Sequence, residues 1–195
     1  AQAFEKAQSL GASPDVFAKT LQALGMAGKT KEVKTRGAQW LTQHPDDVRV
    51  ALMVAETNLA SKEYKPAISV LERALKTAPN SPLVLNNLAW AYQQEKDPRA
   101  LATAEQAFKL AGDNPGVMDT LGWLLVEKGD TARALPLLQK AAEKAPASPE
   151  IRYHLGVALH KSGDKQGARR EIDKALAQNM PFNDIEAARA LLKTL

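Results

Sequence analysis

The sequence contains no cysteine. This absence excludes disulfide bonds, thiolate nucleophiles and sulfur-ligated metal sites, but it leaves the compartment open because cytosolic and periplasmic proteins can both lack cysteine. The sequence also lacks an apolar run of about 18 residues or more, so it predicts no membrane-spanning helix. No basic segment followed by an apolar stretch is present, and we therefore expect no targeting peptide within these residues.

The sequence also lacks a strong excess of one charge. It has 26 Lys and Arg residues against 22 Asp and Glu residues, a formal net charge of +4. The two signs alternate along the chain, as is typical of solvated helix faces. A basic cluster at Lys29, Lys31, Lys34 and Arg36 has no interleaved aromatic residues, which argues against nucleic-acid binding. We expect that cluster to be a solvent-facing helix surface.

Motifs that carry chemistry are scarce. The segment ALGMAGKT, residues 23–30, resembles a phosphate-binding loop, but it lacks the first glycine and a preceding strand, so we interpret it as a turn between helices. His154 and His160 are six residues apart, which places them on different faces of a helix, and no carboxylate has ligand spacing to both. No Ser-His-Asp or paired-carboxylate pattern stands out. We predict no catalytic residue, no bound metal and no cofactor.

What the sequence does contain is an internal period. The residues that open helical patterns stand 34, 34, 33 and 34 residues apart, and each follows a turn rich in Pro, Asp, Asn, Ser or Gly. Proline suits the first helical position because its missing N–H would be unpaired there, and a preceding Ser, Asp or Asn can cap the helix. These opening residues are Pro14, Val48, Pro82, Pro115 and Pro149. Such a period predicts an array of helical hairpins.

A packing code runs through these hairpins. We number each hairpin from its opening residue as position 1. Position 8 is then a small residue: Ala55, Ala89, Gly122 and Gly156. Position 24 is a large apolar residue: Leu71, Leu138 and Ile172. A small residue lets two helices approach closely, and a large one fills the space between them. The first hairpin exchanges the two sizes, because it has Leu21 at position 8 and Gly37 at position 24. We expect this exchange to conserve core volume.

With this code the sequence resembles the tetratricopeptide repeat, most clearly in the four hairpins from Val48 to Pro181. The runs LNNLAWAY, DPRALATAEQAF and MDTLGWLL also resemble the C-terminal part of PrsT-type TPR lipoproteins, which accompany bacterial PEP-CTERM sorting and exopolysaccharide loci. The resemblance implies an all-α fold: a right-handed TPR superhelix, or α-α solenoid, of about five repeats followed by a C-terminal capping helix.

We predict one TPR array over residues 1–195. Residues 1–10 have the pattern of the second helix of a preceding repeat, so we expect the array to extend upstream. The predicted repeats are 14–47, 48–81, 82–114, 115–148 and 149–181, and the capping helix is 183–195.

The resemblance implies that the first helix of each repeat lines a concave groove. The groove residues that we predict to bind a partner are Asn86, Asn87, Trp90, Gln93, Asp119, Thr120, Trp123, Glu127, Tyr153 and His154. An amide beside a tryptophan can hold a peptide backbone or a sugar, because it offers a donor and an acceptor next to apolar area. The alternative is that each tryptophan only packs on the adjacent helix. Because these positions lack Lys and Arg in the third and fourth repeats, we do not predict a carboxylate clamp for a chaperone.

The resemblance implies a non-enzymatic scaffold that binds a protein or an extended peptide in cell-envelope exopolysaccharide export or protein sorting. It also implies a periplasmic or outer-membrane-anchored location. Three alternatives stay open: a glycan-binding periplasmic component of polysaccharide export, the scaffold fragment of a larger enzyme, and a cytoplasmic assembly adaptor.

Overall fold

The computed structural model describes residues 13–178 and 180–195, and in these residues it contains eleven α-helices and no strand. This confirms the all-α fold class. The predicted final helix of a preceding repeat, residues 1–10, lies outside the described residues. No described helix has the combined length and apolar character that crossing a membrane requires.

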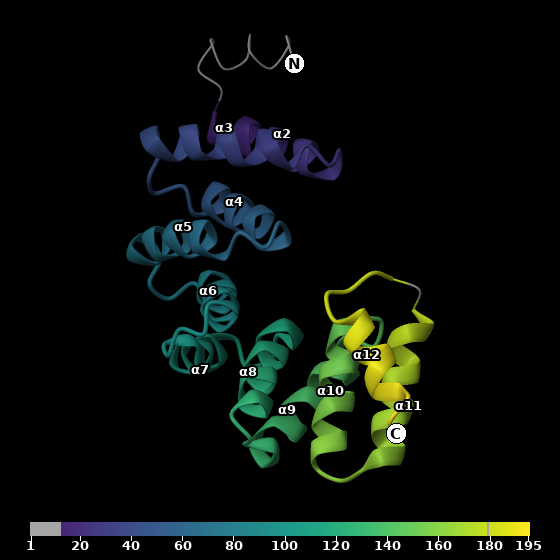
Figure 1. Ribbon diagram of the computed structural model, residues 1–195. Coiled ribbons are helices and arrows are strands. Elements are labelled where there is room, and N and C mark those ends of the chain that lie inside the picture. The colour runs from purple at the N-terminus through teal and green to yellow at the C-terminus, as the bar shows by residue number, and fades with distance from the viewer. Residues whose placement is uncertain (1–12, 179) are drawn as a thin grey trace. The chain divides into compact units, whose positions relative to one another are not determined.

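The chain divides into two compact units, the first ending at Asp97 and the second beginning at Pro98. Figure 1 labels the helices of both units. The first unit contains α2 (Pro14–Met26), α3 (Thr30–Gln43), α4 (Val48–Ala60), α5 (Tyr64–Thr77) and α6 (Pro82–Gln94). The second unit contains α7 (Ala100–Ala111), α8 (Pro115–Glu127), α9 (Thr131–Lys144), α10 (Pro149–Lys161), α11 (Lys165–Ala177) and α12 (Ile185–Leu192). The division falls between the two helices of the third predicted repeat, so the single continuous array stays a prediction.

The predicted turns do start the helices. Pro82, Pro115 and Pro149 each occupy the first position of their helix. The residue before each proline caps it: the hydroxyls of Ser81 and Ser148 and the amide oxygen of Asn114 accept backbone N–H groups of the first turn. These caps pair amides that a helix start otherwise leaves without a partner, so the helix boundaries follow from the local sequence.

The packing code is also confirmed. A Cβ atom added to Gly122 on α8 would lie 2.7 Å from Cγ of Leu138 on α9. In the next hairpin a Cβ atom added to Gly156 would lie 2.6 Å from Cδ1 of Ile172. Leu138 and Ile172 are fully buried. Positions 8 and 24 therefore meet inside these two hairpins, and the absence of a side chain at one makes room for the bulk of the other.

The first hairpin shows the exchanged version of this contact. Leu21 is 1% exposed, and the space beside Gly37 is filled by Val54 of the following helix and by Leu21. Trp40 stacks on Phe17 with ring centroids 4.1 Å apart, and its indole N–H donates to Asp47 Oδ2 at 3.0 Å. The exchange therefore keeps a filled core.

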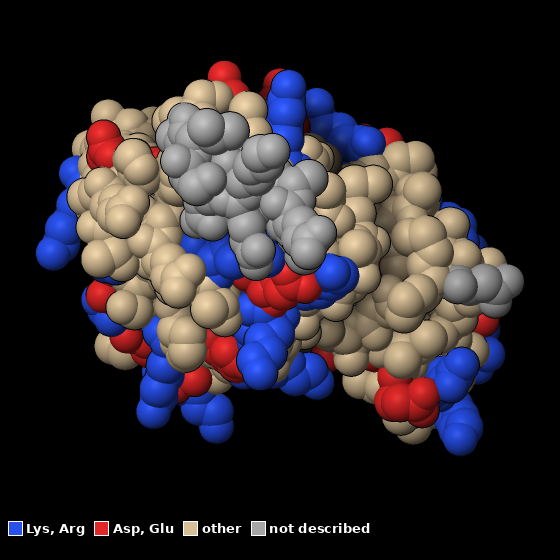
Figure 2. All heavy atoms as spheres, turned by 90° about the horizontal axis from the view of Figure 1, so that it is seen from above, with Lys and Arg blue, Asp and Glu red and all other residues tan. Residues whose placement is uncertain are grey.

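Two features of the first hairpin that could have suggested chemistry have structural explanations. Residues 27–29 form the turn between α2 and α3, as predicted for the segment that resembles a phosphate-binding loop. The basic cluster is largely ion-paired: Lys34 lies 2.6 Å from Glu63, and Lys29 and Arg36 both pair with Glu32. Figure 2 likewise shows basic and acidic side chains beside one another on the face that it presents.

The end of the chain covers the last hairpin. α12 packs on α11, and Ala188 is fully buried in a cluster with Tyr153, Ile172 and Ala175. The ring of Phe182, in the segment before α12, lies 6.0 Å from the ring of Tyr153 on α10. This segment is therefore held against α10, which places the residues that follow it beside the polar groups of that helix.

Candidate functional site

The first-unit residues of the predicted groove lie on α6. Asn86, Asn87, Trp90 and Gln93 are all half-buried. Trp90 packs on a small cluster formed by Leu59, Ala67 and Ala91, and its ring meets the ring of Tyr64 edge-on at 5.7 Å. Part of the Trp90 ring therefore packs against this cluster, and the rest of the side chain stays accessible.

Two amides flank Trp90 on α6. Asn86 is one turn before Trp90 and Gln93 is one turn after it, so the three side chains share a helix face. The oxygens Asn86 Oδ1 and Gln93 Oε1 are buried and have no hydrogen-bond partner among the described residues. An unpaired buried acceptor costs about 1–3 kcal/mol, so two of them beside one tryptophan indicate a face that is incomplete without a donor.

The second-unit residues of the predicted groove come together on α8 and α10. Asp119 Oδ1 lies 2.8 Å from Nδ1 of His154, and both residues are buried. The ring of Trp123 stacks on the imidazole of His154, with centroids 4.2 Å apart and an interplanar angle of 17°. Tyr153 lies tilted at 6.0 Å from Trp123. A buried acid–imidazole pair therefore sits under a half-buried tryptophan.

The electrostatics of this cluster raise the pKa of the imidazole. Burial opposes the charge on His154, but the hydrogen-bonded carboxylate of Asp119 and further carboxylates nearby outweigh burial, so the pKa of His154 is raised. Burial raises the pKa of Glu150, which lies one turn before His154 on α10. Burial also raises the pKa of the Tyr153 phenol.

Two predicted groove residues do not join this cluster. The hydroxyl of Thr120 is buried and donates to the carbonyl of Gly116 in its own helix at 3.0 Å. Glu127 is exposed at the end of α8.

Two acidic residues that sequence reasoning missed do belong to the cluster. Glu150 and Asp184 each place a carboxylate oxygen, and His154 a ring nitrogen, within 4.8 Å of one another. Glu150 and His154 are four residues apart, so the sequence alone could have indicated that they share one face of a helix. Asp184 gave none, because it lies outside the repeats and reaches α10 only through the fold.

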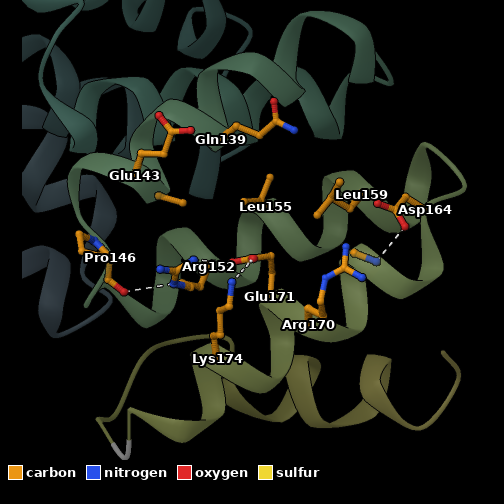
Figure 3. Close-up of a pocket in the computed structure, with 12 residues that line it drawn as sticks. Gln139, Glu143, Pro146, Arg152, Leu155, Leu159, Asp164, Arg170, Glu171 and Lys174 are labelled. Carbon is orange, nitrogen blue, oxygen red and sulfur yellow. Dashed lines mark hydrogen bonds and ion pairs between the residues drawn. The ribbon is translucent and has the colours of Figure 1, made fainter.

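A polar pocket lies on a different face of α10 (Figure 3). Its volume is about 560 Å³, and its lining comes from α9, α10, α11 and the adjoining turns. Arg152 donates to Glu171 at 2.6 Å and to the carbonyl of Pro146 at 3.1 Å, while Lys174 lies 2.7 Å from Glu171. Because these charges already satisfy one another, we assign the pocket a structural role.

Glu171 gives this pocket an expected pH dependence. Burial opposes its charge, but hydrogen bonds from Lys174 and Arg152 outweigh burial and lower its pKa below the ordinary 4.5. A lowered folded-state pKa stabilises the fold above the unfolded-state value, and this stabilisation is lost as the pH falls through the folded-state value. We expect Glu171→Gln to lower the free energy of unfolding by about 1 kcal/mol at pH 7.

The measurement is urea unfolding at pH 7 and pH 3, followed by circular dichroism. The difference between Glu171→Gln and the unchanged protein should shrink at the acidic pH. Glu143→Gln, an exposed change in the same pocket, serves as the control. A difference that stays constant between the two pH values would contradict the ion-pair explanation.

Comparison with known proteins agrees with the geometry. Residues 120–184 match the family model of the tetratricopeptide repeat. A TPR repeat-containing protein of Pseudomonas aeruginosa is 47% identical over 53 residues, a match that spans 27% of this chain and 22% of that protein.

Two solved structures are similar over nearly the whole chain. A thermophilic TPR protein of Thermus thermophilus has a TM-score of 0.74 at 19% identity, covering 94% of this chain and 100% of that chain. YrrB, described as a TPR protein with an unusual peptide-binding site, has a TM-score of 0.67 at 17% identity, covering 99% and 98%. The described residues therefore have the fold of a tetratricopeptide-repeat solenoid. The family match covers about a third of the chain, and the structural likeness extends the same fold to the rest of the described residues.

Proposed function

We propose that this chain is a non-enzymatic scaffold that binds an extended peptide segment of a partner protein on the first helices of its repeats. The observation that carries the proposal is the face of α6, where Trp90 stands between two amides whose buried oxygens lack a hydrogen-bond partner in the described residues. Once these half-buried side chains rotate to expose their amides, an extended peptide can supply backbone N–H donors to the amide oxygens and apolar side chains to the ring.

The second unit adds a related surface. Trp123 is half-buried and rests on His154, which fixes the orientation of the indole ring. A rigid aromatic ring loses little conformational entropy on binding, so it is a suitable anchor for a peptide side chain. The description of YrrB as a peptide-binding TPR protein supports the same use of the fold.

We further propose that the scaffold acts in cell-envelope exopolysaccharide export or protein sorting, in the periplasm or anchored to the outer membrane. The support is the resemblance of three sequence runs to PrsT-type lipoproteins. Fractionation of cells expressing the protein from its own gene tests this, because recovery in the cytoplasmic fraction alone would contradict the proposed location.

The test of peptide binding starts from a display library of random 12-residue peptides panned against the 195-residue chain. Selected peptides are then titrated calorimetrically into the unchanged protein, Trp90→Ala and Asn86→Ala. We expect both variants to bind about tenfold more weakly or worse, since buried anchors dominate peptide affinity. Lys76→Ala, an exposed change on the second helix α5, should bind normally.

Two outcomes would overturn the proposed site. Peptides that bind Trp90→Ala and Asn86→Ala as tightly as the unchanged protein would place binding elsewhere. If no peptide binds and an exported oligosaccharide instead changes tryptophan fluorescence in a Trp90-dependent way, the groove binds glycan.

A further inference from the structure

Glu150, His154 and Asp184 form a set of ligand-type side chains inside the second unit. Glu150 and His154 lie one turn apart on α10, and Asp184 immediately precedes α12. One ligand atom from each lies within 4.8 Å of the other two. Two carboxylates and an imidazole are a donor set that divalent transition metals accept.

Asp119 fixes the orientation of the His154 imidazole ring. His154 is 5% exposed, and its Nδ1 is taken by Asp119 at 2.8 Å. Because Nδ1 is bonded to Asp119, Nε2 is the ring nitrogen left to bind an ion. Metal-binding histidines commonly pair their other nitrogen with a carboxylate, which fixes the ring and makes it a better donor. In this cluster Asp119 is the carboxylate that pairs with the other ring nitrogen.

The position of Asp184 is a second, independent observation. Three other aspartates that immediately precede helices, Asp47, Asp130 and Asp164, accept a backbone N–H of the first turn. Asp184 occupies the same position before α12, yet its carboxylate caps nothing. It lies instead with Glu150 and His154. Asp184 thus gives up its capping bond and places its carboxylate beside a second carboxylate and an imidazole, an arrangement that suits a bound cation.

The charge balance supports a cation. Within the part of the chain that the structure describes, no lysine or arginine forms an ion pair with Asp119, Glu150 or Asp184. Three carboxyl groups therefore surround one imidazole. Like charges held this close and partly buried repel, and a dication relieves the repulsion.

Although the sequence alone predicts no bound metal, we propose that Glu150, His154 and Asp184 bind a divalent transition metal ion of the zinc class, with Asp119 as the residue that positions the imidazole. The ion takes the place of a proton on Nε2 of His154, so zinc binding releases that proton. Two ligands about 2.1 Å from a tetrahedral zinc lie about 3.4 Å apart, so ligand atoms that lie within 4.8 Å of one another need to approach by no more than about 1.4 Å. Asp184 lies outside the helices, and its approach closes the site. The bound ion ties the segment before α12 to α10 and so fastens the end of the repeat array.

The test is calorimetric titration of ZnCl₂ into the 195-residue chain without an affinity tag. Glu150→Gln and Asp184→Asn keep the side-chain shape, and circular dichroism verifies that both variants fold. We expect one zinc per chain and an affinity at least about tenfold weaker in each variant. Asp173→Asn, exposed on α11, and His160→Gln, on the same helix as His154, are the matched controls and should bind normally.

Two further measurements identify the ligands. Co²⁺ bound to the unchanged protein should give the visible absorption of a tetrahedral site, and Asp184→Asn should lose it. Asp119→Asn should keep one zinc per chain but weaken the affinity about tenfold, as expected for a positioning residue. No zinc binding at 1 mM, or binding that survives both Glu150→Gln and Asp184→Asn, would overturn the proposal.

Discussion

Replacing Asp119 by alanine is expected to lower the free energy of unfolding by about 3 kcal/mol. Asp119 and His154 are both buried and bonded at 2.8 Å, so the change leaves a buried imidazole without its partner. Removing one member of a buried ion pair commonly costs about 3–5 kcal/mol. The lower end applies here because His154 can release its proton and become neutral. Urea unfolding followed by circular dichroism at pH 7 measures the loss.

The control for this prediction is Asp113→Ala. Asp113 also forms an ion pair, with Lys140 at 3.1 Å, but its side chain is 82% exposed. Removing its carboxylate should therefore lower the free energy of unfolding much less. Asp119→Asn should fall between the unchanged protein and Asp119→Ala, since the amide oxygen can still accept a hydrogen bond from the ring. If Asp119→Ala is as stable as Asp113→Ala, the pair is not buried in solution.

The helix positions were predictable because their signals are local. Proline at the first helical position and a Ser or Asn before it act within one turn, as the caps on α6, α8 and α10 show. The contact between Gly122 and Leu138 was predictable for a related reason. A period of 34 residues superimposes equivalent positions, so one small–large pair in any hairpin predicts the others.

The Asp119–His154 pair was not predictable from the sequence. These residues are 35 positions apart in different helices, and their contact depends on how α8 and α10 are rotated about their axes. Asp184 was still less accessible, because it lies beyond the last repeat and no period relates it to α10. The groove positions given by the family resemblance therefore included Asp119 and His154 but not Glu150 and Asp184, whose carboxylates lie beside His154.

The division of the chain after Asp97 falls beside a hairpin turn that differs from those of the fourth and fifth repeats. α9 and α11 begin after an aspartate whose side chain caps the helix, whereas α7 begins after Arg99, which provides no side-chain cap. The preceding turns differ as well: Gly129 and Gly163 adopt the left-handed conformation that glycine tolerates, and Lys96 adopts it at φ 56° in the third repeat. The second repeat has the same kind of turn, with Lys62 at φ 59° and no side-chain cap before α5, so the turn alone does not account for the division.

Leu138→Ala is expected to lower the free energy of unfolding by about 3 kcal/mol. Leu138 is fully buried and fills the space above Gly122, so its truncation leaves a cavity in the α8–α9 hairpin. Gly122→Ala should cost only about 1 kcal/mol: the new methyl group would crowd Leu138, but alanine favours the helix over glycine. Urea unfolding of both single variants provides these values.

The double variant tests the contact itself. With Leu138 shortened, the methyl group of Gly122→Ala enters the cavity instead of colliding, and its helix preference is kept. We therefore expect the double variant to be more stable than the sum of the single effects predicts, by about 1–2 kcal/mol. In the first hairpin Leu21 lies beside Gly37 with the two sizes reversed, so the fold already divides the volume at these positions in more than one way. Additive effects, within about 0.5 kcal/mol, would mean that positions 8 and 24 contribute to stability independently of each other.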